Sequence, residues 1–245
     1  MELNKRFFTL IVSILMILTI PFIIYGFNSN SVAFDKEMYK KEFSKYDVYE
    51  NLENYDVEEI NDDVLDYLQF EKNNELIKND FFNEREKIHL LDVKNLIQTI
   101  FNIYYFSIIL FILLIIILFI LLNFNFRLIA KRILIILLIG SLLTLIDAAT
   151  FFILSSFNFA FAFDLFHRTF FSPGTFTFNP EFENIVVLYP ENLFFDFLVR
   201  IISNTVLSSI ILFFVSIILF FIFFRQNLLK FFIKIPTRKI KNRKV

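Results

Sequence analysis

The chain has 245 residues, of which 57% are hydrophobic and 38 are phenylalanine, and its formal net charge is −1. A water-soluble domain of this length has far fewer apolar residues, so the composition predicts an integral membrane protein. The chain contains no cysteine, which excludes disulfides, thiolate metal ligands and a cysteine nucleophile.

Four apolar stretches are long enough to cross the membrane, since about 20 helical residues span about 30 Å of hydrocarbon. They cover residues 7–26, 96–122, 133–155 and 197–224. We therefore expect an all-α integral membrane protein with four transmembrane helices, forming a single membrane domain over residues 1–245.

The first apolar stretch follows Lys5 and Arg6, as in a secretory signal peptide, and Ser-Val-Ala at 31–33 loosely resembles a cleavage site. Its length argues against cleavage, because the apolar region of a signal peptide has only about 7–15 residues. We expect a retained signal anchor, kinked near its outer end by Pro21.

Charge is strongly segregated between the connecting segments. Thirteen basic residues, opposed only by Glu2, lie before the first span, between the second and third, and after the fourth. The segments 27–95 and 156–196 hold 23 of the 25 acidic residues. Because basic loops stay in the cytoplasm, we expect a multi-pass plasma-membrane protein with both termini cytoplasmic and these two large loops extracytoplasmic.

The basic tail, residues 225–245, contains apolar residues as well and is expected to lie along the anionic inner leaflet. Binding of nucleic acid is the weaker interpretation, because the same basic excess orients any protein of this kind. With three glycines in the chain, a glycine-rich phosphate-binding loop is not expected either.

The first outer segment is polar enough to form a small helical extracytoplasmic cap. Within it, Val57–Phe70 places apolar residues at the three-four spacing of an amphipathic helix. The apolar face needs a partner, which could be the membrane surface or the second outer loop.

A second helix is expected to begin at Asn83, because Glu86 follows three positions later as in a capping box. Neither glycine nor proline interrupts the chain from there to Leu122. His89 would then stand about 10 Å before the apolar stretch that begins at residue 96, with Asp92 on the same helix face.

The second outer segment is rich in phenylalanine and contains Pro173-Gly174, Pro180 and Pro190. This pattern indicates an aromatic-rich, irregular loop in the membrane interface. The expected interface anchors are Phe170, Phe171, Phe176 and Phe178.

His89 and His167 are the two histidines of the chain, and the predicted topology places both on the outer side. A neutral imidazole can accept a proton at one nitrogen and donate one from the other, which suits acyl transfer. Chance is the competing explanation, since most of the sequence outside the membrane lies on that side. Zinc bound by both histidines and Asp92, Asp164 or Asp196 is a further alternative, but no metal-binding motif such as HExxH is present, so no metal or cofactor is expected.

Asp147 lies inside the third apolar stretch, where a carboxylate costs several kcal/mol unless it is paired or hydrated. Arg200, near the outer end of the fourth stretch, is the expected partner. The pair would be either functional or a purely structural link between two helices.

Two segments, EREKIHLLDVKNLI (84–97) and FHRTFFSPGTFTFNPEFENIVVLYPENLFFDFLVR (166–200), resemble the bacterial lipoprotein intramolecular transacylases and their relatives. The residues that carry the resemblance are His89, Asp92, Val93, Phe166, His167, Phe170, Phe171, Phe178, Pro180, Leu188, Pro190 and Asp196. Phe176 and one of Phe194 or Phe195 depart from the pattern, because tryptophan is expected there.

The resemblance implies a substrate with a diacylglyceryl group on its N-terminal cysteine, whose sn-2 acyl chain moves to the free α-amine of the same cysteine. The partners would be this lipoprotein N-terminus and membrane lipid. For this reaction we expect one of His89 and His167 to act as general base and the other as acid or oxyanion donor. Asp92 or Asp196 would orient an imidazole, and Arg168 or Arg200 would stabilise the oxyanion.

Two rival functions remain at this stage. One is a non-catalytic membrane protein of the same fold that binds lipid or a protein partner. The other is a metal-dependent membrane hydrolase, which would lose activity to chelators.

Overall fold

The computed structural model describes residues 2–70, 75–172 and 174–233, and all regular structure within these ranges is α-helical. The predicted all-α class is confirmed. The nine helices of the described ranges are α1 (Glu2–Ala33), α2 (Lys36–Lys45), α3 (Val48–Asn51), α4 (Val57–Gln69), α5 (Glu84–Leu121), α6 (Phe126–Phe157), α7 (Phe159–Phe170), α8 (Ile185–Leu188) and α9 (Glu191–Ile233).

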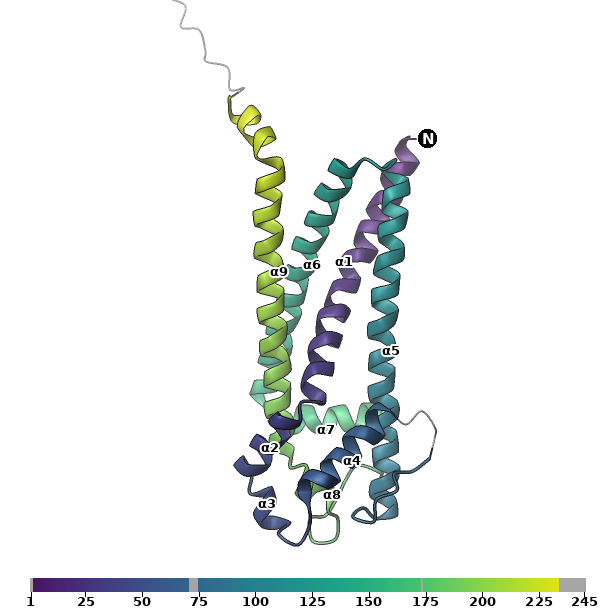
Figure 1. The fold of residues 1–245 in the computed structure, drawn as a ribbon, viewed down its shortest axis with the longest axis vertical. Coiled ribbons are helices and arrows are strands. Elements are labelled where there is room, and N and C mark those ends of the chain that lie inside the picture. The colour runs from purple at the N-terminus through teal and green to yellow at the C-terminus, as the bar shows by residue number, and fades with distance from the viewer. Residues whose placement is uncertain (1, 71–74, 173, 234–245) are drawn as a thin grey trace, which may run out of the picture.

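Four of these helices, α1, α5, α6 and α9, are long and apolar enough to cross a membrane, as predicted. They stand side by side, with the start of α1 and the end of α9 at the same end of the bundle (Figure 1). All four extend beyond the predicted apolar stretches, because polar residues continue each helix past the hydrocarbon region. The final part of the predicted basic tail, residues 234–245, lies outside the described residues.

Helix α1 lies at the centre of the bundle and packs against α5, α6 and α9. Its buried apolar residues in the bundle core recur every four positions, as expected for one helix face. They are Val12, Met16, Ile20 and Ile24. The approach to α6 is close, because a Cβ atom added at Gly140 would lie 2.2 Å from Ile20 Cδ1.

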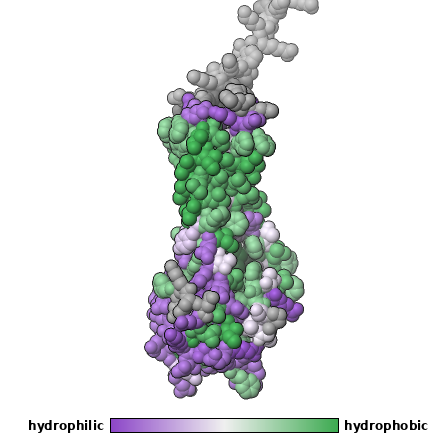
Figure 2. Space-filling view, turned by 90° about the vertical axis from the view of Figure 1, so that its right-hand side faces the viewer, coloured by the Kyte–Doolittle hydropathy of each residue, from purple (hydrophilic) through white to green (hydrophobic). Residues whose placement is uncertain are grey.

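The outer surface of the bundle is an apolar belt with a hydrophilic band at one end and a more polar cap at the other (Figure 2). Large apolar side chains on the spanning helices, such as Phe106, Leu113 and Phe214, are more than half exposed. Exposure of so much apolar area is stable only in lipid, which agrees with the predicted membrane location.

The cap has a hydrophobic core of its own, formed by both outer segments. Buried Val57, Ile60 and Val64 of α4 pack in one cluster with Ile185 and Leu188 of α8. Helix α4 also contacts α5. The partner of the amphipathic helix is therefore the second outer segment together with α5, and not the membrane surface.

The prediction of an irregular second outer loop is wrong for much of its length. Asn158 ends α6, and its side chain accepts a hydrogen bond from Phe161 N at 3.0 Å, which starts α7. Residues 159–170 contain neither proline nor glycine, so nothing interrupts this helix. Helix α7 runs across the bundle at its junction with the cap (Figure 1).

Candidate functional site

The N-terminus of α5 carries the predicted capping box and fixes the position of His89. Asn83 accepts from Glu86 N at 3.0 Å, and Glu86 accepts from Asn83 N at 2.6 Å. A helix of 38 residues is about 57 Å long, roughly twice the hydrocarbon thickness. The first turns of α5 therefore project beyond the membrane-spanning segment and place His89 in the cap.

His167 reaches the same place from α7. The imidazole rings of His89 and His167 lie nearly parallel, with ring centroids 6.0 Å apart and an angle of 18° between their planes. Two histidines separated by 78 positions in sequence, 167 − 89, thus form one site. A single small ester group could contact both rings.

Phenylalanines surround the imidazole pair. The Phe171 ring contacts both His89 and His167, at centroid distances of 4.9 and 5.2 Å. Phe178 lies 5.3 Å from His89, and Phe176 lies 5.7 Å from His167. Phe163 of α7 is closer still to His167, at 4.2 Å.

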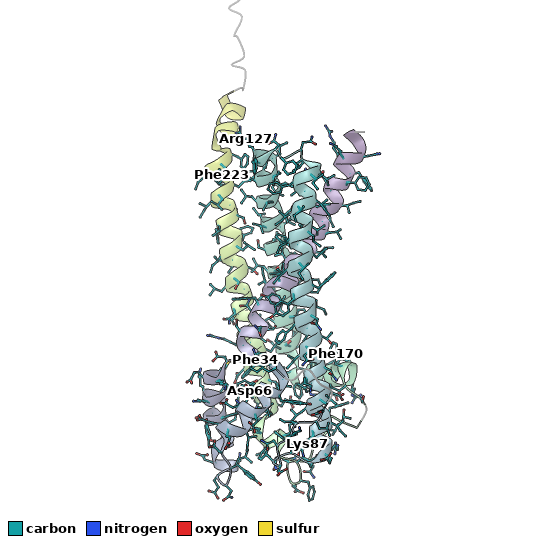
Figure 3. All side chains as sticks on the ribbon, turned by 45° about the vertical axis from the view of Figure 1, so that its right-hand side comes forward. Phe34, Asp66, Lys87, Arg127, Phe170 and Phe223 are labelled. Atoms are coloured by element: carbon teal, nitrogen blue, oxygen red, sulfur yellow. The ribbon has the colours of Figure 1, made fainter. Side chains whose placement is uncertain are left out.

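These contacts change the interpretation of the four expected interface anchors. Phe171 is buried and therefore does not face lipid, while Phe176 and Phe178 are half-buried against the imidazoles. Phe170 is 55% exposed and lies where the cap meets the bundle (Figure 3), and its role as an interface anchor stays a prediction.

The aromatic surroundings keep both imidazoles neutral near pH 7. Burial, and to a smaller extent the neighbouring His167, lowers the pKa of His89 to about 4. Burial also lowers the pKa of His167, although its hydrogen bond to the Phe163 carbonyl opposes this shift. Neutral rings can exchange protons with a substrate, whereas two adjacent imidazolium ions would repel each other.

Hydrogen bonding distinguishes the two rings. His167 Nδ1 lies 2.7 Å from the Phe163 carbonyl oxygen, so a neutral ring must carry its proton on Nδ1 and leave Nε2 as an acceptor. His89 Nδ1 is buried and has no hydrogen-bond partner among the described residues. Because a buried N–H is rarely left unpaired, this favours a proton on His89 Nε2. The pair thus offers one acceptor and one donor.

The expected orienting carboxylates do not contact the imidazoles. Asp92 accepts a long hydrogen bond, 3.4 Å, from the Thr175 hydroxyl. Asp196 forms an ion pair with Lys45, the last residue of α2, and accepts a hydrogen bond from the Tyr46 hydroxyl at 2.5 Å. It therefore joins α9 to the end of α2. The sequence could not predict this difference, because α2 becomes adjacent to α9 only in the folded cap.

The expected cations also have other surroundings. Arg168 is 70% exposed at its side chain and pairs with Asp164 at 2.9 Å, one turn away on α7. Arg200 is exposed, and within the described ranges no ion pair joins it to Asp147.

Arg85 was not expected from the sequence, yet it contacts the loop that covers the imidazoles. Its guanidinium binds the carboxylate of Glu183 at 2.9 Å and the carbonyls of Gly174 and Thr177. The available signal was its spacing, since Arg85 precedes His89 by four residues and shares its helix face.

No group of three or more histidine and carboxylate side chains suited to a metal ion occurs among the residues that the structure describes. Of the carboxylates considered as zinc ligands, Asp164 and Asp196 are engaged by Arg168 and Lys45.

Comparisons with known proteins agree with the fold. The family model for "Lipoprotein intramolecular transacylase Lit" matches residues 14–195. The solved structure of Lit from Bacillus cereus has a TM-score of 0.74 at 22% identity, covering 91% of this chain and 99% of that one. A His-to-Arg variant of the same enzyme gives 0.71 at 21% identity, with 93% and 96% covered. At these identities the structures establish the fold alone, and no curated protein matches the chain. Because the family model spans most of its length, the chain belongs to the lipoprotein intramolecular transacylase family of membrane acyltransferases.

Proposed function

We propose that this protein moves the sn-2 acyl chain of a diacylglyceryl-cysteine lipoprotein to the α-amine of the same cysteine, leaving a lyso-form lipoprotein. The observation that carries the proposal is the pair of imidazole rings, 6.0 Å apart, where the cap meets an apolar bundle. Lipid ester groups lie at this depth of a bilayer, next to the hydrocarbon.

The reaction requires no protein nucleophile. The cysteine amine attacks the sn-2 ester carbonyl, the bond from that carbonyl to the glyceryl oxygen breaks, and an amide forms. The amine loses one proton and the glyceryl oxygen gains one, so the products balance without water or a cofactor. Because both groups belong to one substrate molecule, holding them together supplies a high effective molarity.

The two imidazoles would divide the proton transfers between them. The acceptor Nε2 of His167 suits removal of the amine proton, since its Nδ1 is held by the Phe163 carbonyl. The expected N–H of His89 Nε2 suits stabilisation of the oxyanion and protonation of the leaving oxygen. Each of these contributions is worth about 10²–10⁴ in rate.

The lipid-facing side of α7 would bring the acyl chains to the site. Phe161 and Leu165 are more than half exposed on this helix, and the helical period places them on the side away from His167. The partners are therefore a diacylated lipoprotein N-terminus and membrane lipid, with neither nucleic acid nor a soluble cofactor.

A synthetic lipopeptide with an isotopically heavy sn-2 chain tests the reaction directly. Incubated with the purified protein in nanodiscs, it should give a product of unchanged mass whose heavy acyl group is on the cysteine nitrogen in fragment spectra. Release of heavy free fatty acid, abolished by a chelator, would instead indicate a metal-dependent hydrolase. Retention of the lipopeptide without conversion would indicate a binding protein.

A further inference from the structure

Arg85 contacts four residues of the second outer segment. Its Nε donates to the Gly174 carbonyl at 3.0 Å, Nη1 donates to Glu183 Oε1 at 2.9 Å, and Nη2 donates to the Thr177 carbonyl. Its guanidinium carbon also lies 5.0 Å from the centre of the Phe178 ring. One side chain thereby binds both ends of the segment 174–178.

Glu183 is itself held in place. Its side chain is only 8% exposed, and its second carboxylate oxygen accepts from Asn179 N at 2.7 Å. The carboxylate therefore links Arg85 to the backbone just beyond the segment 174–178. The Arg85 side chain is 44% exposed, but the buried carboxylate and the additional hydrogen bonds fix its geometry more strongly than a fully exposed pair would.

The segment 174–178 supplies one wall of the imidazole site. Phe178 contacts His89 and Phe176 contacts His167, at 5.3 and 5.7 Å. The two phenyl rings belong to a short stretch that is neither helix nor strand, so no regular backbone hydrogen bonds hold them in position. A side chain that fixes this stretch also fixes the burial of the imidazoles.

We propose that Arg85 and Glu183 are positioning residues that hold the segment 174–178 against His89 and His167. This inference rests on the proposed function, because holding the segment in place matters for acyl transfer only if the two histidines carry out that reaction. Arg85 would act on the histidines through Phe178 and would not contact the substrate. Lysine should not replace it, since an ammonium cannot bind two carbonyls and a carboxylate in this fixed, planar arrangement.

The pKa values of the two histidines report the packing of the segment. The titratable group that acts on His89 is His167 on α7, while Asp164 of α7 and Glu191 of α9 act on His167. Arg85 and Asp92 lie on the same helix as His89, and the segment itself contributes phenyl rings. Loosening the segment exposes His89 to water, and its pKa should then rise from about 4 toward the ordinary 6.5.

The chain contains two histidines, so ¹⁵N-histidine labelling gives two imidazole signals that can be titrated by NMR in nanodiscs without substrate. Arg85→Gln and Arg85→Lys should raise the pKa of His89 by about one unit or more. They should also slow transfer about tenfold or more at unchanged KM. The matched control is Lys36→Gln, which removes the ion pair of Lys36 with Asp62 between α2 and α4 and should leave both pKa values unchanged.

Glu183→Gln separates packing from charge. Loss of the Arg85 charge could by itself raise an imidazole pKa, whereas loss of a negative charge could only lower it. A raised His89 pKa in Glu183→Gln therefore supports the positioning role, and an unchanged or lowered value overturns it. A lower melting temperature without a pKa shift in the Arg85 variants would also overturn it. Because the titration uses no substrate, it remains informative even if the proposed reaction is wrong.

Discussion

His89 shows most clearly how single residues give this protein its chemistry. It is 7% exposed, although it lies on a helix that begins in the polar cap. Phe171 and Phe178 from the second outer segment cover it, and their rings lie within 5.3 Å of the imidazole. The sequence identified both histidines as candidates because of their residue type and shared side. It could not give their mutual distance or their pKa values, which depend on how α7 crosses the bundle.

The buried histidine predicts a specific dependence of stability on pH. The unfolded chain protonates His89 below about pH 6.5, whereas the folded protein does so only near pH 4. Between these values the unfolded state binds more protons, so the free energy of unfolding falls as the pH is lowered from about 6.5 to about 4. The loss should be on the order of 3 kcal/mol.

Thermal unfolding of the wild type and His89→Gln at pH 7 and pH 4.5 measures this effect. The wild type should lose more stability than the variant does between the two pH values, because glutamine does not titrate. Equal losses in both proteins would contradict the burial of a neutral imidazole.

At the scale of elements, α5 joins the membrane bundle, the cap and the site in one continuous helix. The sequence predicted this helix from its capping box and from the absence of glycine and proline. The structure confirms the capping box and the continuous helix. Helix α7 was not predicted, because three prolines and a glycine later in the segment suggested irregular structure throughout. The overlooked signal is the four-residue spacing of Phe159, Phe163 and His167, which stack along one face of α7.

Glu86 links the start of α5 to the second outer segment and should be important for cap stability. It is 1% exposed and accepts from both Asn83 N and Ile185 N, at 2.6 and 2.7 Å. Glu86→Ala leaves two backbone donors without their partner, which should cost about 2–4 kcal/mol of unfolding free energy. Faster hydrogen exchange of the Ile185 amide should accompany this loss.

Glu84→Ala provides the matched control, because Glu84 lies in the same helical turn with a side chain that is 78% exposed. This change should alter stability by less than about 0.5 kcal/mol. Similar losses in the two variants would show that Glu86 does not join the two outer segments.

For the whole molecule, the number of spans and their apolar character could be predicted from the sequence, because both depend on composition over long windows. The packing between segments distant in sequence could not be predicted. The Asp196 carboxylate binds Lys45. No ion pair joins Asp147 to Arg200 within the described ranges. Such contacts depend on the rotation of each helix about its axis, which the sequence pattern does not specify. The side of the membrane on which each end lies stays a prediction from the charge distribution.

Labelling of introduced cysteines tests this orientation against a background without native cysteine. A membrane-impermeant maleimide should label Glu53→Cys, in the cap, on intact cells. It should label Asn4→Cys, near the start of α1, only after the membrane is permeabilised. The reverse pattern would place the histidine pair on the cytoplasmic side and contradict the proposed encounter with mature lipoproteins.

The most direct test of the central claim is a comparison of transfer rates for His89→Gln, His167→Gln and the double variant, with the isotopically labelled lipopeptide. If the two imidazoles act as one proton-transfer unit, each single variant should lose about 10²–10⁴ in rate, and the double variant should be little slower than the slower single one. A single variant that transfers the acyl chain at the wild-type rate would contradict the claim that both histidines take part in the reaction.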